Sequence, residues 1–161
     1  MRLTVHTDYA LRLLMYLALR PSAQTTIQEV AEAYGISRNH MMKVAHALGR
    51  AGFVETLRGR AGGLRLARDP AAITVGEVVR STEEDWRMVE CFDPARNRCV
   101  IAGPCRLRGV LKRALDAYLA VLDGCTLADL SDDPAALGLV LGVVPATAAS
   151  PRTPEPPRGW P

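Results

Sequence analysis

The sequence predicts a mainly α-helical protein with one small β-hairpin, and three observations support this fold class. Three segments near the N-terminus place apolar residues at helical spacing, each after a residue that can cap a helix. A Gly- and Arg-rich stretch between two short alternating runs follows, which is typical of a hairpin. A longer helical pattern begins at Cys105. The 161 residues, 48% hydrophobic and 23% charged, suffice for a small domain with an appendage.

The first three helices are predicted from their capping residues. Residues 7–19 form an amphipathic pattern with Thr7 as the predicted N-cap. A second helix follows Thr26, with Glu29 placed as in a capping box, and ends at Gly35. Ser37 precedes a third helix over 38–51. Two helices joined by a turn, here over about 26–51, form a helix-turn-helix.

The third predicted helix has two different faces. At about 100° per residue, its apolar residues lie opposite an arc of cations and amide donors that can contact phosphates and base edges. An ordinary amphipathic surface helix would look similar, and the next segment favours DNA binding. The candidate DNA-binding residues of this helix and its cap are Ser37, Arg38, Asn39, His40, Lys43 and His46.

Residues 53–68 predict a β-hairpin whose tip carries Arg58 and Arg60 among glycines. A hairpin directly after a helix-turn-helix is the wing of a winged-helix domain, and arginines at its tip suit the DNA backbone or a minor groove. The window 38–68 is strongly basic, with Glu55 as its one acid, although the whole chain carries only +3. We expect a short helix over 73–83 to complete a DNA-binding domain over 1–83.

Residues 84–105 have no helical or strand period and contain Cys91 and Cys99, with Cys105 at their end. This spacing lacks the C-x2-C pairs typical of zinc sites. All three histidines lie in the DNA-binding half, so no cysteine–histidine catalytic pair is indicated and the sequence does not predict an enzyme. Thiolates on a long loop suit an iron–sulfur cluster, and metal-free redox thiols remain an alternative. Cys125 is predicted not to be a ligand.

The last predicted helical region spans 105–130 and repeats apolar residues at spacings of four and three, as in a heptad seam. This stripe could pack within the monomer, but we favour a dimer interface formed by Leu107, Leu111, Ala114, Tyr118 and Val121. The Pro-rich tail over 143–161 is predicted to be disordered. No apolar run could span a membrane and no signal peptide is indicated, so we expect a cytoplasmic protein.

Several motifs in the same order resemble those of a known family. The start MRLTVHTDYALR, the helix SRNHMMKVAHALGRAGFVE, the wing RGRAGGLRLAR and the three-cysteine loop are similar to the winged-helix iron–sulfur regulators that include the IscR and NsrR types. The stretches ECFDPARNRCVIAGPCRLRGVL and LDGCTLADL resemble the NsrR type most. Arg108 stands where IscR-like proteins place a histidine ligand, and it cannot ligate iron.

The resemblance implies a homodimeric repressor that binds palindromic double-stranded promoter DNA and takes nitric oxide as its signal. It also implies one iron–sulfur cluster per subunit, [4Fe-4S] rather than [2Fe-2S], held by Cys91, Cys99 and Cys105 and by Asp8 of the partner subunit. Asp8 is otherwise an acid in the first turn of a helix, where it stabilises the dipole. An IscR-type regulator of cluster biogenesis and a metal-free thiol switch are the alternatives.

Overall fold

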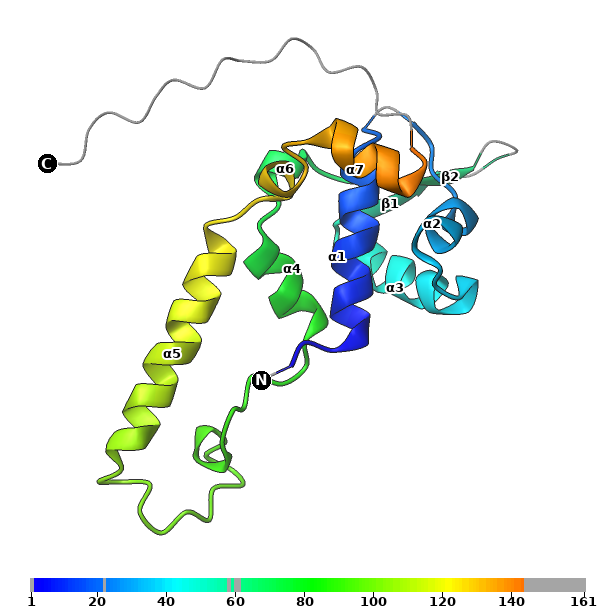
Figure 1. The fold of residues 1–161 in the computed structure, drawn as a ribbon. Helices are drawn as coiled ribbons and strands as arrows, with labels where there is room; N and C mark the ends of the chain where they lie inside the picture. The colour runs from blue at the N-terminus through cyan, green and yellow to red at the C-terminus, as the bar shows by residue number, and fades with distance from the viewer. Residues whose placement is uncertain (1, 22, 58, 60–61, 144–161) are drawn as a thin grey trace, which may run out of the picture.

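The computed structural model describes residues 2–21, 23–57, 59 and 62–143, and its central helix is α1 (Val5–Ala18). Ala10, Leu13 and Leu14 on this helix are completely buried. Helices α3, α4 and α6 and strand β2 all contact α1, so the core forms around it (Figure 1). The mainly helical fold with one two-stranded hairpin is the predicted fold class.

The N-terminal cap of α1 differs from the prediction. Thr4, not Thr7, is the N-cap, and its hydroxyl accepts a hydrogen bond from the Thr7 amide at 3.2 Å. Thr7 lies inside the first turn and is completely buried, with its own hydroxyl 3.0 Å from that of Thr4. Threonine is a favourable N-cap residue, so the sequence alone allows either position. In the structure Thr7 is buried inside the first turn, and Thr4 is the cap.

The helix-turn-helix has the predicted caps. Helix α2 (Ile27–Tyr34) begins with a complete capping box, in which the Glu29 carboxylate accepts from the Thr26 amide at 2.6 Å. Gly35 ends it in the left-handed conformation, with φ of 62°, which glycine adopts without the steric cost of a Cβ atom. Ser37 then caps α3 (Arg38–Arg50).

The hairpin consists of β1 (Val54–Leu57) and β2 (Gly63–Leu66), which pair antiparallel with Val54 opposite Leu66. Leu64 and Thr25 exchange backbone hydrogen bonds at 2.7 and 3.1 Å, which fix the hairpin to the start of α2. A side chain at Gly63 would collide with the Thr25 backbone, so this close approach requires glycine. The predicted tip residues Arg58 and Arg60 lie outside the described residues.

After a 3-10 turn at Pro70–Ala72, α4 (Val75–Thr82) begins beside the end of α5 (Arg106–Asp123). Two backbone hydrogen bonds connect residues 73–76 with residues 123–127, the Val75 amide donating to Cys125 at 2.8 Å and the Leu127 amide to Ile73 at 2.9 Å. The Arg80 guanidinium forms a two-pronged ion pair with the Asp123 carboxylate. We call this contact region the joint.

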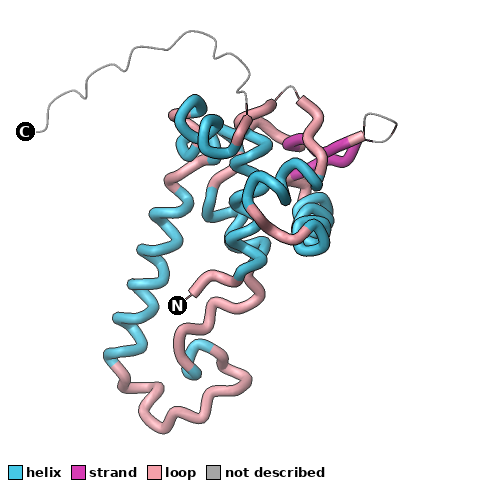
Figure 2. The backbone as a smooth tube through the Cα atoms, turned by 45° about the vertical axis from the view of Figure 1, so that its right-hand side comes forward, coloured by secondary structure: helices cyan, strands magenta, loops and turns pink. Residues whose placement is uncertain are grey.

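Helix α5 lies beside α4 and extends past it toward the cysteine segment, residues 84–105, which Figure 2 draws mostly as loop. Within this segment, Glu90–Phe92 form one 3-10 turn. The short helix α6 (Leu127–Leu130) follows the joint and lies within the predicted helical region over 105–130.

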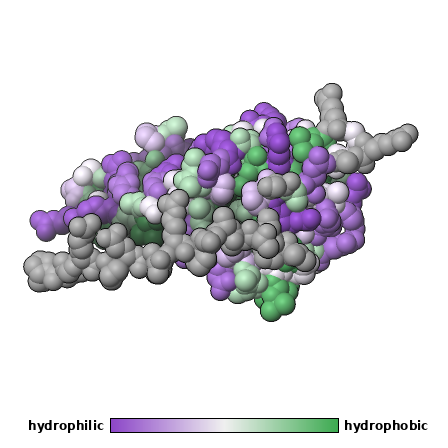
Figure 3. All heavy atoms as spheres, turned by 90° about the horizontal axis from the view of Figure 1, so that it is seen from above, coloured by the Kyte–Doolittle hydropathy of each residue, from purple (hydrophilic) through white to green (hydrophobic). Residues whose placement is uncertain are grey.

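Helix α7 (Pro134–Leu141) was not predicted. Its end returns to the body, where Leu141 and Val143 line a cleft with Tyr16 of α1. Its other side leaves Leu139 83% exposed, so its apolar residues do not lie on one face. Viewed from above, hydrophobic and hydrophilic side chains are mixed on the described surface (Figure 3). The predicted disorder of the tail concerns residues 144–161, which the structure does not describe.

Candidate nucleic-acid interface and metal centre

Helix α3 separates its side chains as the wheel predicts. Met41, Val44 and Leu48 are buried against the rest of the body. The rest of the helix surface is exposed. It contains the predicted DNA-binding residues Arg38, Asn39, His40, Lys43 and His46, together with Arg50. Within the described part of the chain, none of the cations on this face forms an ion pair with a carboxylate. The face therefore retains the charge needed for phosphates.

Other basic residues of the window are engaged within the fold. Arg65 pairs with Glu55 across the hairpin. Arg68 donates to Glu77 at 2.8 Å and lies over the Phe53 ring at 5.1 Å from its centroid. Within residues 38–68, the described cations that form no ion pair are therefore those of α3, namely Arg38, Lys43 and Arg50.

A series of contacts connects Asp8 with α3. The Asp8 carboxylate pairs with Arg12 at 2.8 Å, and its side chain remains 46% exposed. The Arg12 guanidinium lies 5.8 Å from the Tyr9 ring centre, and the Tyr9 and His40 rings are 6.3 Å apart. Sequence reasoning missed Arg12 and Tyr9. The four-residue spacing of Asp8 and Arg12 was a readable signal, whereas the contact between Tyr9 and His40 joins two distant helices.

Arg12 also reaches the helix-turn-helix by a second route, because it lies 5.9 Å from the Tyr34 ring centre at the end of α2. Burial raises the pKa of Tyr34 to about 12, against the lowering effect of the Arg12 charge. Tyr34 therefore stays neutral at physiological pH, and its ring provides a fixed surface for the guanidinium. Arg12 thus contacts aromatic rings of two helices while holding Asp8.

The three predicted cysteine ligands lie in one segment. Cys91 is buried in the 3-10 turn, and Cys105 is the N-cap of α5. Cys99 lies between them, and its backbone amide donates a hydrogen bond to the side-chain oxygen of Asn97 at 3.0 Å. All are free thiols. Over the described ranges, no three cysteine, histidine or acidic side chains lie close enough to hold a metal ion. The structure thus groups the cysteines in one segment without bringing them or Asp8 into a closed ligand set.

The donor set nevertheless fits an iron–sulfur cluster chemically. Three thiols are available and none is consumed in a disulfide. Cys105 lies at the N-terminal end of the 18-residue helix α5, where the dipole is favourable for a negatively charged cluster. Arg98, Arg106 and Arg108 add positive charge nearby in sequence. Cys125 lies in the joint, away from the other three cysteines in sequence, and its backbone carbonyl accepts a hydrogen bond from the Val75 amide.

Ion pairs organise the cysteine segment from within. Arg87 forms ion pairs with Asp85 at 2.6 Å and with Asp93 at 2.5 Å. It therefore connects a residue before the 3-10 turn with the residue directly after it. Hydrogen bonds to these carboxylates raise the pKa of Arg87 further, and it stays charged. The Glu90 carboxylate accepts from the Arg98 amide at 2.5 Å and connects the turn with the stretch before Cys99. These contacts connect residues 85–93 with one another and with residue 98 inside the segment.

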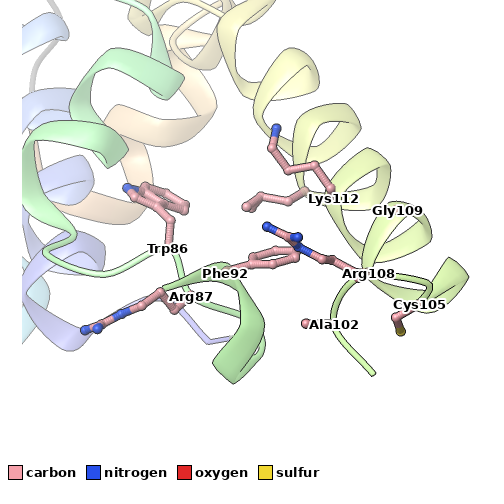
Figure 4. Close-up of a pocket in the computed structure, with 10 residues that line it drawn as sticks. Trp86, Arg87, Phe92, Ala102, Cys105, Arg108, Gly109 and Lys112 are labelled. Carbon is pink, nitrogen blue, oxygen red and sulfur yellow. The ribbon is translucent and has the colours of Figure 1, made fainter. Parts of the chain in front are cut away.

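A cavity of about 490 Å³ opens between this segment and the start of α5. Trp86 and Phe92 approach it from the segment, and Arg108 and Lys112 approach it from α5 (Figure 4). Cys105 is the only one of the three cysteines among its lining residues. Arg108 therefore faces the space beside Cys105, where its guanidinium offers positive charge and no electron pair for a metal.

The predicted seam on α5 is largely open to solvent. Leu107 is 61% exposed and Val121 is 73% exposed, while Leu111 and Tyr118 are half-buried and Ala114 is exposed. Leu115, on the neighbouring face, is buried. Packing within one chain therefore buries Leu115 and leaves most of the seam uncovered.

In the described part of the chain, no helix combines the length and the apolar character that crossing a membrane requires.

Comparison with known proteins identifies the family. Residues 3–133 match the model of the Rrf2 family, described as iron-dependent transcriptional regulators. The HTH-type transcriptional regulator NsrR of Bacillus subtilis is 56% identical over 131 residues, covering 81% of this chain and 90% of that protein. NsrR of Geobacillus kaustophilus is 50% identical over 142 residues, covering 88% of this chain and 97% of that protein.

Solved structures agree with the fold. The cysteine regulator CymR of B. subtilis superposes with a TM-score of 0.67 at 27% identity, covering 82% of this chain and 97% of that chain. IscR of T. potens gives a TM-score of 0.67 at 25% identity, covering 85% and 90%. The predicted resemblance is confirmed: the chain belongs to the Rrf2 family and is a transcriptional regulator.

Proposed function

We propose that this regulator is a homodimeric, nitric-oxide-sensing repressor that binds palindromic promoter DNA and carries one iron–sulfur cluster per subunit. The observation that carries this proposal is the series of contacts from Asp8 through Arg12 and Tyr9 to His40 on the exposed face of α3. It gives a candidate ligand a physical connection to a candidate DNA-reading helix. The NsrR-named relatives at 50–56% identity support the same function.

In this proposal residues 1–83 bind DNA, and α3 enters the major groove. Asn39 and His46 offer side chains that can contact base edges, and Lys43 offers a phosphate contact. Arg58 and Arg60 would reach the flanking minor groove. A two-fold dimer would then place two α3 helices about one helical turn of DNA apart, which corresponds to a palindromic site.

Cys91, Cys99 and Cys105 would hold the cluster together with Asp8 of the partner subunit, and [4Fe-4S] is favoured over [2Fe-2S]. When bound, the cluster supplies an iron that can react with nitric oxide. The Asp8 oxygen is the one non-thiolate donor of the set and already has a second partner in Arg12. A change in the position of Asp8 would therefore be passed by Arg12 to the rings of Tyr9 and Tyr34, and so to the helix-turn-helix.

Free thiols and a DNA target suit the cytoplasm, and the proposed function requires no catalytic group. The direct test is anaerobic purification followed by iron and sulfide counting, visible absorbance and DNA binding before and after nitric oxide. A colourless protein whose DNA affinity responds only to disulfide formation would support the metal-free thiol switch instead.

We expect Lys43→Ala to weaken DNA binding without affecting cluster absorbance. Loss of a phosphate or groove contact costs about 1–3 kcal/mol, and Lys43 is exposed, so the fold should be unchanged. The measurement is a titration of a duplex selected by the wild-type protein, at two salt concentrations. Arg113→Ala, which removes an exposed cation from α5, is the control. Equal affinities for the Lys43 variant and the wild type would remove α3 from the interface.

Asp8→Ala is expected to leave a coloured protein with altered visible circular dichroism and an altered nitric-oxide titration. Three thiolates would still anchor the cluster while the fourth ligand is replaced. DNA affinity should fall because the connection to Arg12 is lost. Asp116→Ala is a matched control, since Asp116 is also a half-exposed acid in an i,i+4 pair, with Lys112. If Asp8 only stabilises its helix by about 0.3–1 kcal/mol, both variants will keep the wild-type spectrum and titration.

A further inference from the structure

The N-terminal cap of α1 receives its carboxylate from another helix. Helices α2 and α6 also begin with threonine, and in each the acid three residues later accepts from the cap amide, Glu29 at 2.6 Å and Asp129 at 2.7 Å. In α1 the residue three positions after Thr4 is a buried threonine, Thr7, which has no carboxylate. The Thr4 amide instead donates to Glu83 at 2.7 Å, across 79 positions of sequence.

The position of Glu83 does not suit its own helix. Glu83 is the C-cap of α4, where the negative end of the helix dipole disfavours a carboxylate. The same carboxylate lies at the positive end of α1, where the dipole favours it. Burial raises the pKa of Glu83, but hydrogen bonds from Thr7 and Thr4 outweigh this effect and the pKa is lowered. The contact with α1 therefore accounts for a charge that α4 alone would not stabilise.

Glu83 joins the first turn of α1 to the cysteine segment. Asp8 lies in the first turn of α1, and its amide donates to the Thr4 carbonyl at 3.1 Å. Glu83 immediately precedes the cysteine segment, residues 84–105. Thr4 thus connects Asp8 with the start of that segment, because its carbonyl accepts from the Asp8 amide and its amide donates to the Glu83 carboxylate.

We propose that Glu83 is a positioning residue that fixes the Asp8 turn to the cysteine segment of its own chain, so that the two move together. The inference rests on the proposed function in one respect, the ligation of the partner's cluster by Asp8. With that ligation, Glu83 couples the two clusters of a dimer. A rearranged cysteine segment in one subunit would shift the Asp8 that serves the other subunit, and the two clusters would respond cooperatively.

The coupling is tested first in metal-free protein by hydrogen exchange. Glu83→Ala is expected to accelerate exchange at least several-fold both in the first turn of α1 and at the Phe92 and Asp93 amides of the 3-10 turn. Glu83→Gln keeps an acceptor oxygen for the Thr4 amide and should restore most of the protection. The matched control is Asp129→Ala, which removes the same kind of bond within α6 and should affect α6 alone. Acceleration confined to the Thr4 region would reduce Glu83 to a local cap and overturn the proposal.

The second test uses the cluster-loaded dimer and a nitric-oxide titration followed by visible circular dichroism. The wild type should lose its two clusters cooperatively, and Glu83→Ala should make the two losses independent. Adding Glu83→Ala to Asp8→Ala should change the spectrum no further, because both act through the same ligand. Additive changes would contradict the coupling. A spectrum unaffected by Asp8→Ala would contradict the proposed ligand set, while the hydrogen-exchange result would still decide the role of Glu83.

Discussion

The double variant Leu107→Glu/Val121→Glu is expected to be a folded monomer that binds its DNA site about 100- to 10,000-fold more weakly, the range that linking two binding modules contributes. Both side chains are mostly exposed in a single chain, so charging them removes no packing within it. In the proposed dimer they would face the same seam on the partner, and like charges would be buried against each other. Analytical ultracentrifugation and DNA titration measure the two effects.

Ala120→Glu is the control, because Ala120 is exposed on α5 and lies about 140° around the helix from Leu107 at about 100° per residue. It introduces the same charge away from the seam and should leave dimerisation and DNA binding intact. If the double variant stays dimeric, the seam is not the interface, and another surface must join the subunits.

Replacing Cys91 by alanine is expected to reduce the iron and sulfide content of anaerobically prepared protein from a full complement to nearly none. Three protein thiolates would anchor the cluster, and the loss of one leaves two together with a single carboxylate oxygen. Cys91 is also the buried member of the set, so external thiols cannot easily replace it. The same result is expected for Cys99→Ala and Cys105→Ala, by elemental analysis and visible absorbance.

Cys125→Ala provides the comparison for these variants. Cys125 contributes its backbone carbonyl to the joint, and alanine keeps that carbonyl. The variant should therefore retain its colour and its DNA affinity. Cluster loss in Cys125→Ala with retention in Cys91→Ala would contradict the assigned ligand set.

Local signals predicted the helix-turn-helix well because each of its boundaries depends on residues close in sequence. The Thr26 capping box, the left-handed Gly35 and the Ser37 cap all satisfy backbone groups within a few positions. The first cap was placed at Thr7 rather than Thr4, since the choice depends on burial and on Glu83, which is far away in the chain.

Helix α7 was missed for a different reason. Its caps were readable, with Asp133 before Pro134 and Gly142 in the left-handed conformation at its end. Its sequence PAALGLVL is apolar all around, however, and shows no helical period that would distinguish it from an extended run. Capping signals alone would have identified it.

The candidate site was predictable in its residue types and not in its arrangement. Spacing and resemblance identified Cys91, Cys99, Cys105 and Asp8, because thiolate chemistry is visible in sequence. The contacts of Arg12 with Tyr9 and Tyr34, and of Glu83 with Thr4, join elements that only the tertiary fold brings together. Those contacts are the ones through which a signal could travel.

The joint gives α5 the properties of a lever. The helix is attached to the DNA-binding body near Asp123 and carries Cys105 at its opposite end. A helix of 18 residues is about 27 Å long, so a displacement of about 2 Å at the cysteine end corresponds to a rotation of about 4° at the joint. In the proposed dimer, two α5 helices side by side would set the angle between the two winged domains. Because the spacing of DNA grooves is fixed, DNA affinity would depend on that angle.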